Sequence, residues 1–289
     1  MPVSKSLLAL SALVCLPVWA APPAVVSAVQ APAWLERGGK ARPLAAGMAI
    51  ENGDRIRTGD DARVYLALAE GSTVKLGADA RLAFFNMSSK PRREYRGALD
   101  VLTGALRFTT GDARGVKARD VIVRVGTASA AIRGTDVWAR SSPDDDLICL
   151  VDGHIDVWHP TIAGSLPMAM PMTFVDVPKG QAAQPVIAAD PVNFASWARQ
   201  TDIARGAGAS RRGGKFSLSL GRYASEGQAL DQYDLIRGAG YAVSVKPVPA
   251  DGEGWSYQLL VQGFADEGEA AAAAARLKAA TGIDATTTR

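Results

Sequence analysis

Short stretches in which apolar and polar residues alternate run through the first two thirds of the chain. Residues 63–68, 73–76 and 121–125 show this pattern, and Gly-Asp and similar turn-forming pairs separate the stretches. A period of two is typical of strands that bury one face, and no helical spacing intervenes. The pattern predicts an all-β domain over residues 28–186, folded as a sandwich or a short β-solenoid.

We expect a helix and a flexible linker over residues 187–213. Asp190 and Pro191 precede apolar residues at helical spacing over 192–205. Asp is a common cap at helix N-termini, and Pro is well tolerated in the first helical turn. The segment 206–214 is rich in Gly, a composition that is typical of flexible linkers.

The last third of the chain contains one pattern twice. Residues 216–227 and 257–268, which begin 41 positions apart, share an aromatic residue, an alternating apolar run, a second aromatic residue and a Glu-Gly pair. Each copy continues into a helical stretch and a further extended segment. A strand–helix–strand unit that is present twice predicts a small α+β domain with pseudo-twofold symmetry over residues 214–289.

Five segments of the first domain, taken in order, resemble the FecR-like periplasmic domain family. They are residues 53–59, 70–76, 104–108, 132–138 and 150–157. The resemblance covers about residues 28–157 and agrees with the β pattern.

Within this resemblance, the Arg-Gly-Thr-Asp motif at 133–136 has two interpretations. It presents an arginine and a carboxylate to a partner, or it forms a turn in which Gly134 permits a kink and Arg133 pairs with Asp136. We favour the turn, since Gly and Asp at such positions usually fix backbone geometry.

The duplicated unit resembles the SPOR (sporulation-related repeat) domain over residues 215–289. The resemblance rests on the full pattern of apolar strand, glycine and aromatic residue, acidic helix start, Gly240-Tyr241, Trp255 and second copy. It implies a four-stranded antiparallel sheet with two helices on one face. It also implies that the other face binds septal peptidoglycan, specifically glycan strands stripped of their stem peptides.

Strand alternation assigns the two faces of this sheet, because a two-layer domain buries only one of them. The residues that we expect to bind glycan are Ser217, Ser219, Arg222, Trp255, Gln258 and Gln262. Hydroxyl and amide groups suit sugar hydroxyls, and a tryptophan ring offers a stacking surface. Arg222 offers a planar cation to the lactyl carboxylate that stripped muramic acid exposes.

The first 20 residues have the features of a secretory signal peptide. Lys5 supplies the positive start, residues 7–16 the short apolar stretch and residues 18–20 a small-residue cleavage site. This stretch is shorter than the roughly 20 residues that span a membrane. We therefore expect a periplasmic protein with no stable membrane span, and an uncleaved anchor is the alternative. Cys149 is then the one cysteine left, and its apolar neighbours favour a buried, unreactive thiol.

Charge and motifs argue against nucleic acid and catalysis. The chain has a net charge of +3, and residues 214–289 hold seven Lys and Arg against nine Asp and Glu, hence −2. Nucleic-acid binding favours a basic surface. His154 and His159 lack partners at metal-ligand spacing, and the three Asp at 144–146 lack the rest of a calcium loop. We expect no enzyme and no cofactor.

The sequence thus predicts an exported cell-envelope binding protein. Its SPOR-like domain would dock on denuded peptidoglycan at the division septum, while its FecR-like domain would bind an unknown envelope protein. A periplasmic signalling or receptor-accessory protein of the FecR type is the alternative. A direct sigma-factor regulator is not expected, because only six residues precede the apolar run. A third alternative is an adhesin-like β protein that SPOR retains at the wall.

Overall fold

The computed structural model describes residues 22–88, 94–111, 118–250 and 252–289. Within these residues the chain is mostly β-sheet, with three α-helices. The expected signal peptide and Cys15 lie outside the described residues. None of the helices in the described part is long and apolar enough to cross a membrane.

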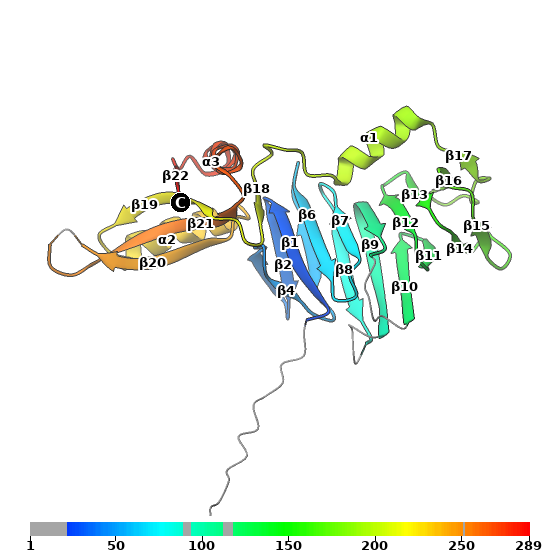
Figure 1. The fold of residues 1–289 in the computed structure, drawn as a ribbon, viewed down its shortest axis with the longest axis horizontal. Coiled ribbons are helices and arrows are strands. Elements are labelled where there is room, and N and C mark those ends of the chain that lie inside the picture. The colour runs from blue at the N-terminus through cyan, green and yellow to red at the C-terminus, as the bar shows by residue number, and fades with distance from the viewer. Residues whose placement is uncertain (1–21, 89–93, 112–117, 251) are drawn as a thin grey trace, which may run out of the picture.

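Two sheets form the N-terminal domain (Figure 1). The first sheet has the order β1 (Ala24–Gln30), β6 (Arg63–Leu68), β7 (Thr73–Leu76), β9 (Glu94–Thr109), β12 (Asp136–Ser141), β13 (Asp145–Asp152), β16 (Thr173–Pro178) and β17 (Ile187–Ala188), and β4 (Ala49–Ile50) pairs with the start of β1. The second sheet has the order β3 (Lys40–Pro43), β2 (Ala33–Arg37), β5 (Arg55–Thr58), β8 (Arg81–Asn86), β9, β10 (Ala118–Val125), β11 (Ala128–Ile132), β14 (Ile155–Trp158) and β15 (Leu166–Met168).

The apolar residues of both sheets meet in one continuous core, which is why the alternating pattern appears in the sequence. Val64, Leu66, Val74 and Leu76 of the first sheet are fully buried, and so is Phe84 of the second. Burial of such side chains contributes about 25 cal/mol for each Å² removed from water. The expected all-β fold is confirmed.

Strand β9 belongs to both sheets. Its first part pairs with β8 and β10, and its last part pairs with β7 and β12. The crossing falls at Gly104, which has a φ of +83°. A Cβ atom there would lie 2.5 Å from the Cα atom of Ala80. Glycine is therefore required, both for the backbone conformation and for the close approach.

Helix α1 (Pro191–Thr201) follows the sandwich. As expected, Asp190 caps it, because the side chain accepts hydrogen bonds from the backbone N–H groups of Val192 and Asn193. The helix packs through Trp197, whose ring stacks on Trp138 with centroids 5.4 Å apart.

This helix ends four residues before the predicted end at residue 205. Asp202 forms an ion pair with Lys75 at 2.6 Å, and the N–H of Ile203 donates to the Tyr65 hydroxyl at 2.6 Å. These contacts with the first sheet hold the chain extended, and this tertiary effect cannot be predicted from local helical spacing.

The C-terminal domain has two layers. An antiparallel sheet has the order β20 (Val243–Pro249), β21 (Trp255–Phe264), β19 (Phe216–Tyr223) and β22 (Thr286–Thr288). Helices α2 (Glu226–Gly238) and α3 (Glu267–Thr281) cover one face of it. The core between the layers consists of Leu218, Leu220, Leu259, Val261, Ile236, Ala270, Ala273 and Leu277. The predicted four-stranded sheet with two helices is confirmed.

The sequence repeat has a structural counterpart in the two helix starts. Ser225 caps α2 by accepting from the N–H of Gln228, and Asp266 caps α3 by accepting from the N–H of Glu269. Both caps stand at the same place in the repeated pattern, and each satisfies a backbone donor that a helix start leaves open.

The segment between the domains differs from the flexible linker that its glycines indicate. Within it, strand β18 (Ala209–Arg211) pairs with β1 of the sandwich over three residues and with β21 at Ser210 and Phe264. Ala209 is fully buried. Strand β18 thus connects the first sheet of the sandwich to the C-terminal sheet (Figure 1).

A buried carboxylate fixes the conformation of this segment. Glu269 of α3 is only 5% exposed. Its Oε1 atom accepts from the N–H of Gly206 at 2.9 Å, and its Oε2 atom accepts from Gly208 at 2.8 Å and Ala209 at 3.0 Å. Hydrogen bonds to an ionised group are stronger than neutral ones. Glu269 therefore turns a glycine-rich segment into an ordered connection.

Further contacts cross the same junction. Arg276 of α3 donates to the carbonyl of Ala31 at 2.8 Å and forms an ion pair with Asp61. The N–H of Ala33 donates to the carbonyl of Gly240 at 3.3 Å. The two domains are therefore joined by backbone, side-chain and ionic contacts.

We predict that Glu269→Gln lowers the free energy of unfolding by about 2 kcal/mol, because it removes the charge and points an amide N–H at backbone donors. Urea unfolding measures the loss, and amide hydrogen exchange at residues 206–209 should accelerate. Glu267→Gln is the matched control, since Glu267 is exposed in the first turn of the same helix. Equal stability of the two variants would contradict the role given to Glu269.

Candidate binding surfaces

The sheet face opposite α2 and α3 is lined by short polar side chains, and we call it the polar face. The pairing register places Ser217 opposite Gln262 and Ser219 opposite Leu260. Directly opposed residues of an antiparallel pair point to the same side. The Nε2 atom of Gln258 donates to the Oγ atom of Ser219 at 3.0 Å. The structure thus brings these four predicted polar residues together, with Leu260 among them.

Arg222 reaches the same face because of a β-bulge. Simple alternation from Ser219 would turn Arg222 toward the helices. The register shifts between Ser219 and Arg222, so that Arg222 lies opposite Gln258. Gly221, with a φ of +109°, allows the irregularity. Tyr223 turns inward and packs against the helix-side core.

The outer strands add polar groups that the sequence analysis missed. Ser244 and Lys246 of β20 lie opposite Leu260 and Gln258. Thr286 and Thr288 of β22 lie opposite Ser219 and Ser217. The run of threonines at the end of the chain is the sequence signal for these additional polar groups. It can be interpreted only once β22 is placed beside β19. The polar face thus extends over all four strands.

Trp255 does not share this face. It is 62% exposed and lies at the start of β21, opposite Pro249. The register between β20 and β21 is regular, so alternation gives Trp255 the same side as Tyr257 and Leu259, which face the helices. The structure therefore brings five of the six predicted residues together and leaves Trp255 apart.

The Arg-Gly-Thr-Asp motif at 133–136 stabilises the backbone conformation of a turn in the sandwich. Asp136 is held by Arg107, not by Arg133: the Nε and Nη2 atoms of Arg107 contact its two carboxylate oxygens at 2.9 and 2.7 Å. Gly134 has a φ of +77°, and the N–H of Thr135 donates to the Thr110 hydroxyl. The turn interpretation fits these contacts, with a different arginine as partner.

The three aspartates at 144–146 are also engaged within the fold. Asp145 forms an ion pair with Arg140 at 2.7 Å, and the fully buried Asp146 accepts from Ser141, Thr127 and Lys179. Burial alone would raise the pKa of Asp146, but the hydrogen bonds from Lys179, Ser141 and Thr127 outweigh it and hold the pKa below its ordinary value. Across the described ranges, no group of three or more His, Cys, Asp or Glu residues is placed to hold a metal ion.

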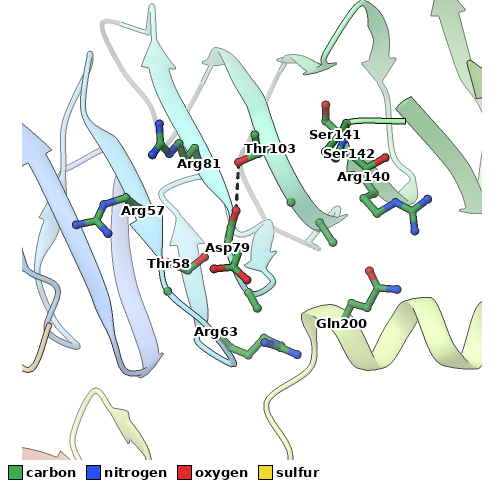
Figure 2. Close-up of a pocket in the computed structure, with 15 residues that line it drawn as sticks. Arg57, Thr58, Arg63, Asp79, Arg81, Thr103, Arg140, Ser141, Ser142 and Gln200 are labelled. Carbon is green, nitrogen blue, oxygen red and sulfur yellow. Dashed lines mark hydrogen bonds between the residues drawn. The ribbon is translucent and has the colours of Figure 1, made fainter. Parts of the chain in front are cut away.

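A second surface is a cleft of about 650 Å³ in the sandwich, which we call the arginine cleft (Figure 2). It lies where β5, β8, β9 and β12 end or turn, beside Gln200 of α1. Its polar lining consists of Arg57, Thr58, Arg63, Asp79, Arg81, Thr103, Arg140, Ser141, Ser142 and Gln200. Four arginines therefore line the cleft with a single carboxylate.

Three of these arginines contact neighbouring groups. The Nη1 atom of Arg63 donates to the carbonyl of Ala62 at 2.8 Å. Arg140 pairs with Asp145, and Arg57 lies 3.8 Å from the ring centroid of Trp34. Burial lowers the pKa of Arg63, and its Nε atom is buried without an acceptor among the described residues. Arg81 is exposed, and no ion pair engages it within the described part of the chain. The cleft thus retains unsatisfied donor capacity.

These two surfaces lie on two domains, and each domain matches a known family. Residues 54–156 match the model of the family described as FecR protein, and residues 213–289 match that of the SPOR domain. The chain therefore contains a FecR domain followed by a SPOR domain. A SPOR domain implies peptidoglycan binding, and both domains are binding or regulatory modules of envelope-associated proteins.

Comparison with individual proteins adds little. No curated protein matches the chain. Two crystal structures of a candidate anti-sigma factor from Parabacteroides distasonis are similar, each with 15% sequence identity. The first has a TM-score of 0.40 and covers 50% of this chain and 64% of its own, which is less than two thirds. The second has a TM-score of 0.41 and covers 79% and 91%.

Cys149 lies fully buried on β13, in the cluster around Trp138. Burial, with a smaller contribution from the Asp136 carboxylate, raises the pKa of its thiol to about 12. A thiol with such a pKa is protonated at neutral pH and is a poor nucleophile.

We predict that Cys149 does not react with Ellman's reagent at pH 8 in the folded protein and reacts fully in 6 M guanidinium chloride. Cys15→Ala leaves it as the only cysteine of the chain. Since its pKa lies well above the assay pH, raising the pH to 9 should leave the folded protein unreactive. Rapid labelling under native conditions would show that the thiol is accessible.

Proposed function

We propose that this is an exported, non-enzymatic cell-envelope protein whose SPOR domain binds peptidoglycan glycan strands that lack stem peptides, as found at the division septum. The observation that carries the proposal is the polar face, which lies opposite both helices and presents hydroxyl, amide and cationic groups. Sugar hydroxyls donate and accept hydrogen bonds, and these groups can match both functions.

The arrangement of charges supports the same ligand. Arg222 and Lys246 lie on either side of Gln258. A stripped glycan strand carries one carboxylate on each muramic acid, spaced by neutral sugars. Two cations among neutral polar groups suit such a sparse anion better than they suit a nucleic acid, which carries a charge at every nucleotide. Binding by many weak contacts is reversible and modest in affinity.

We also propose that the FecR domain binds an envelope protein through an acidic segment that enters the arginine cleft. The support is the cleft's excess of arginine over carboxylate and the exposed Arg81, which has no ion pair among the described residues and can pair with a ligand carboxylate. A periplasmic signalling or receptor-accessory protein is the alternative function, and the identity of this partner distinguishes it from a role in division.

We predict that the full chain pellets with amidase-treated sacculi and far less with untreated sacculi. The double variant Gln258→Ala/Gln262→Ala should weaken binding about tenfold, because each amide contributes roughly one net hydrogen bond. Gln228→Ala, an exposed glutamine on the helix side, is the matched control. Equal pelleting with both kinds of sacculi would exclude specificity for denuded strands, and wild-type behaviour of the double variant would exclude the polar face.

We predict that a photo-crosslinking residue at Gln200 captures an envelope protein, and that Arg81→Glu reduces this capture by about tenfold through charge repulsion. Arg96→Glu makes the same charge change at an exposed arginine outside the cleft and should leave capture intact. If both variants capture the partner equally, the arginine cleft is not its binding site. Capture of an outer-membrane receptor would favour the signalling alternative.

A further inference from the structure

A groove of about 530 Å³ lies at the junction of the two domains, and we call it the junction groove. It begins at Ser244 and Gln262, which are residues of the polar face. From there it passes between the end of the C-terminal sheet and the sandwich. The junction groove is therefore continuous with the surface that we assign to glycan.

The FecR domain supplies one wall of this groove. The connection between β3 and β4 contributes Leu44, Ala45 and Met48. Backbone hydrogen bonds fix this connection: Gly47 donates to the carbonyl of Val26 at 2.8 Å, and Leu44 donates to that of Ala33 at 2.8 Å. The wall is thus apolar and held in place before any ligand arrives.

Two arginines supply the charge. Arg211 of β18 and Arg212 of the following turn line the groove, and no acidic residue lines it. Arg211 is half-buried and Arg212 is exposed, and neither has an ion pair within the described ranges of the chain. Their backbone is fixed, because Arg211 pairs with Ala28 of β1 and the N–H of Arg212 donates to the carbonyl of Ser27 at 3.0 Å. The groove therefore combines a positive charge with an apolar wall.

We propose that the junction groove is a second subsite for the same glycan strand, in which Arg211 and Arg212 bind the lactyl carboxylate of muramic acid and the wall at Ala45 and Met48 packs against its methyl group. This inference rests on the proposed function. The lactyl group carries a methyl and, once the stem peptide is removed, a free carboxylate. In strands that keep their peptides this carboxylate is an amide, which has no charge to offer the arginines.

The subsite explains how the protein distinguishes stripped strands from intact ones. Most groups of the polar face offer hydrogen bonds to sugar hydroxyls, which both kinds of strand possess, and only Arg222 and Lys246 there favour a carboxylate. The two arginines of the junction groove form charge-assisted hydrogen bonds with a carboxylate, which are stronger than the hydrogen bonds that they form with a neutral amide. The junction groove therefore contributes specificity, and the FecR domain takes part in it directly.

The test measures the affinity of the full chain for fluorescent denuded glycan strands by anisotropy, with strands whose carboxylates have been converted to primary amides as the second probe. Arg211→Ala/Arg212→Ala should weaken binding to the carboxylate strands about tenfold. Amidation should weaken wild-type binding clearly more than it weakens binding by the double variant, which keeps only Arg222 and Lys246 of the polar face to meet carboxylates. Arg205→Ala, an exposed arginine of the same segment outside the groove, should bind as the wild type does.

A second variant, Ala45→Trp, fills the groove without removing charge and should also weaken binding, which covers the case in which the arginine variant fails to fold. If both groove variants bind as the wild type does while Gln258→Ala/Gln262→Ala does not, the junction groove is no subsite and the proposed function stands. If amidation affects the wild type and the double variant equally, the carboxylate is not bound by these arginines. If the wild type binds neither probe, the proposed function and the subsite both fail.

Discussion

The contact on which the arrangement of this protein depends is that between the Glu269 carboxylate and the N–H groups of Gly206, Gly208 and Ala209. Without it, a glycine-rich segment would have little reason to leave the ensemble of extended coils that its composition favours. With it, the segment becomes a strand between two sheets. Together with the pairing of β18 and the contacts of Arg276, this buried anion fixes the position of the SPOR sheet relative to the sandwich, and with it the junction groove.

The polar face depends on a second constraint, the burial of one side of a two-layer domain. The residues that pack on α2 and α3 fix which side is buried, so the other side is left to polar groups. The bulge at Gly221 then interrupts the rule in one strand and delivers a cation to the polar side while Tyr223 joins the core. Regular alternation and the interruption at Gly221 thus both contribute to the chemistry of the surface.

The sequence predicted those features that depend on local periodicity. Ser217, Ser219, Gln258 and Gln262 were assigned to one face because β21 keeps a regular register, and the two sheets of the sandwich follow from a period of two. The same alternation places Trp255 on the opposite side of the sheet. Its residue type alone predicts a stacking surface for sugars, and this prediction takes no account of the side of the sheet. The position of Trp255 on the strand, and not the chemistry of its ring, determines on which face of the sheet its side chain lies.

Features that depend on distant contacts were not predictable. Helix α1 stops at Thr201 because Lys75 and Tyr65 hold the chain that follows. The segment at 206–209 is ordered by a glutamate 60 residues from Ala209 in the chain. The arginines of the cleft lie on strands that are brought together only in the folded sandwich, so no sequence motif predicts the cleft. In each case the deciding partner lies on another element of the fold.

Strand β9 has a mechanical consequence. Because one continuous strand carries hydrogen-bond ladders of both sheets, the two layers cannot slide past each other without tearing backbone pairs on both sides of Gly104. A load applied to one layer is shared with the other through a covalent chain and not only through side-chain packing. A sandwich whose layers share one continuous strand therefore resists shear between the layers.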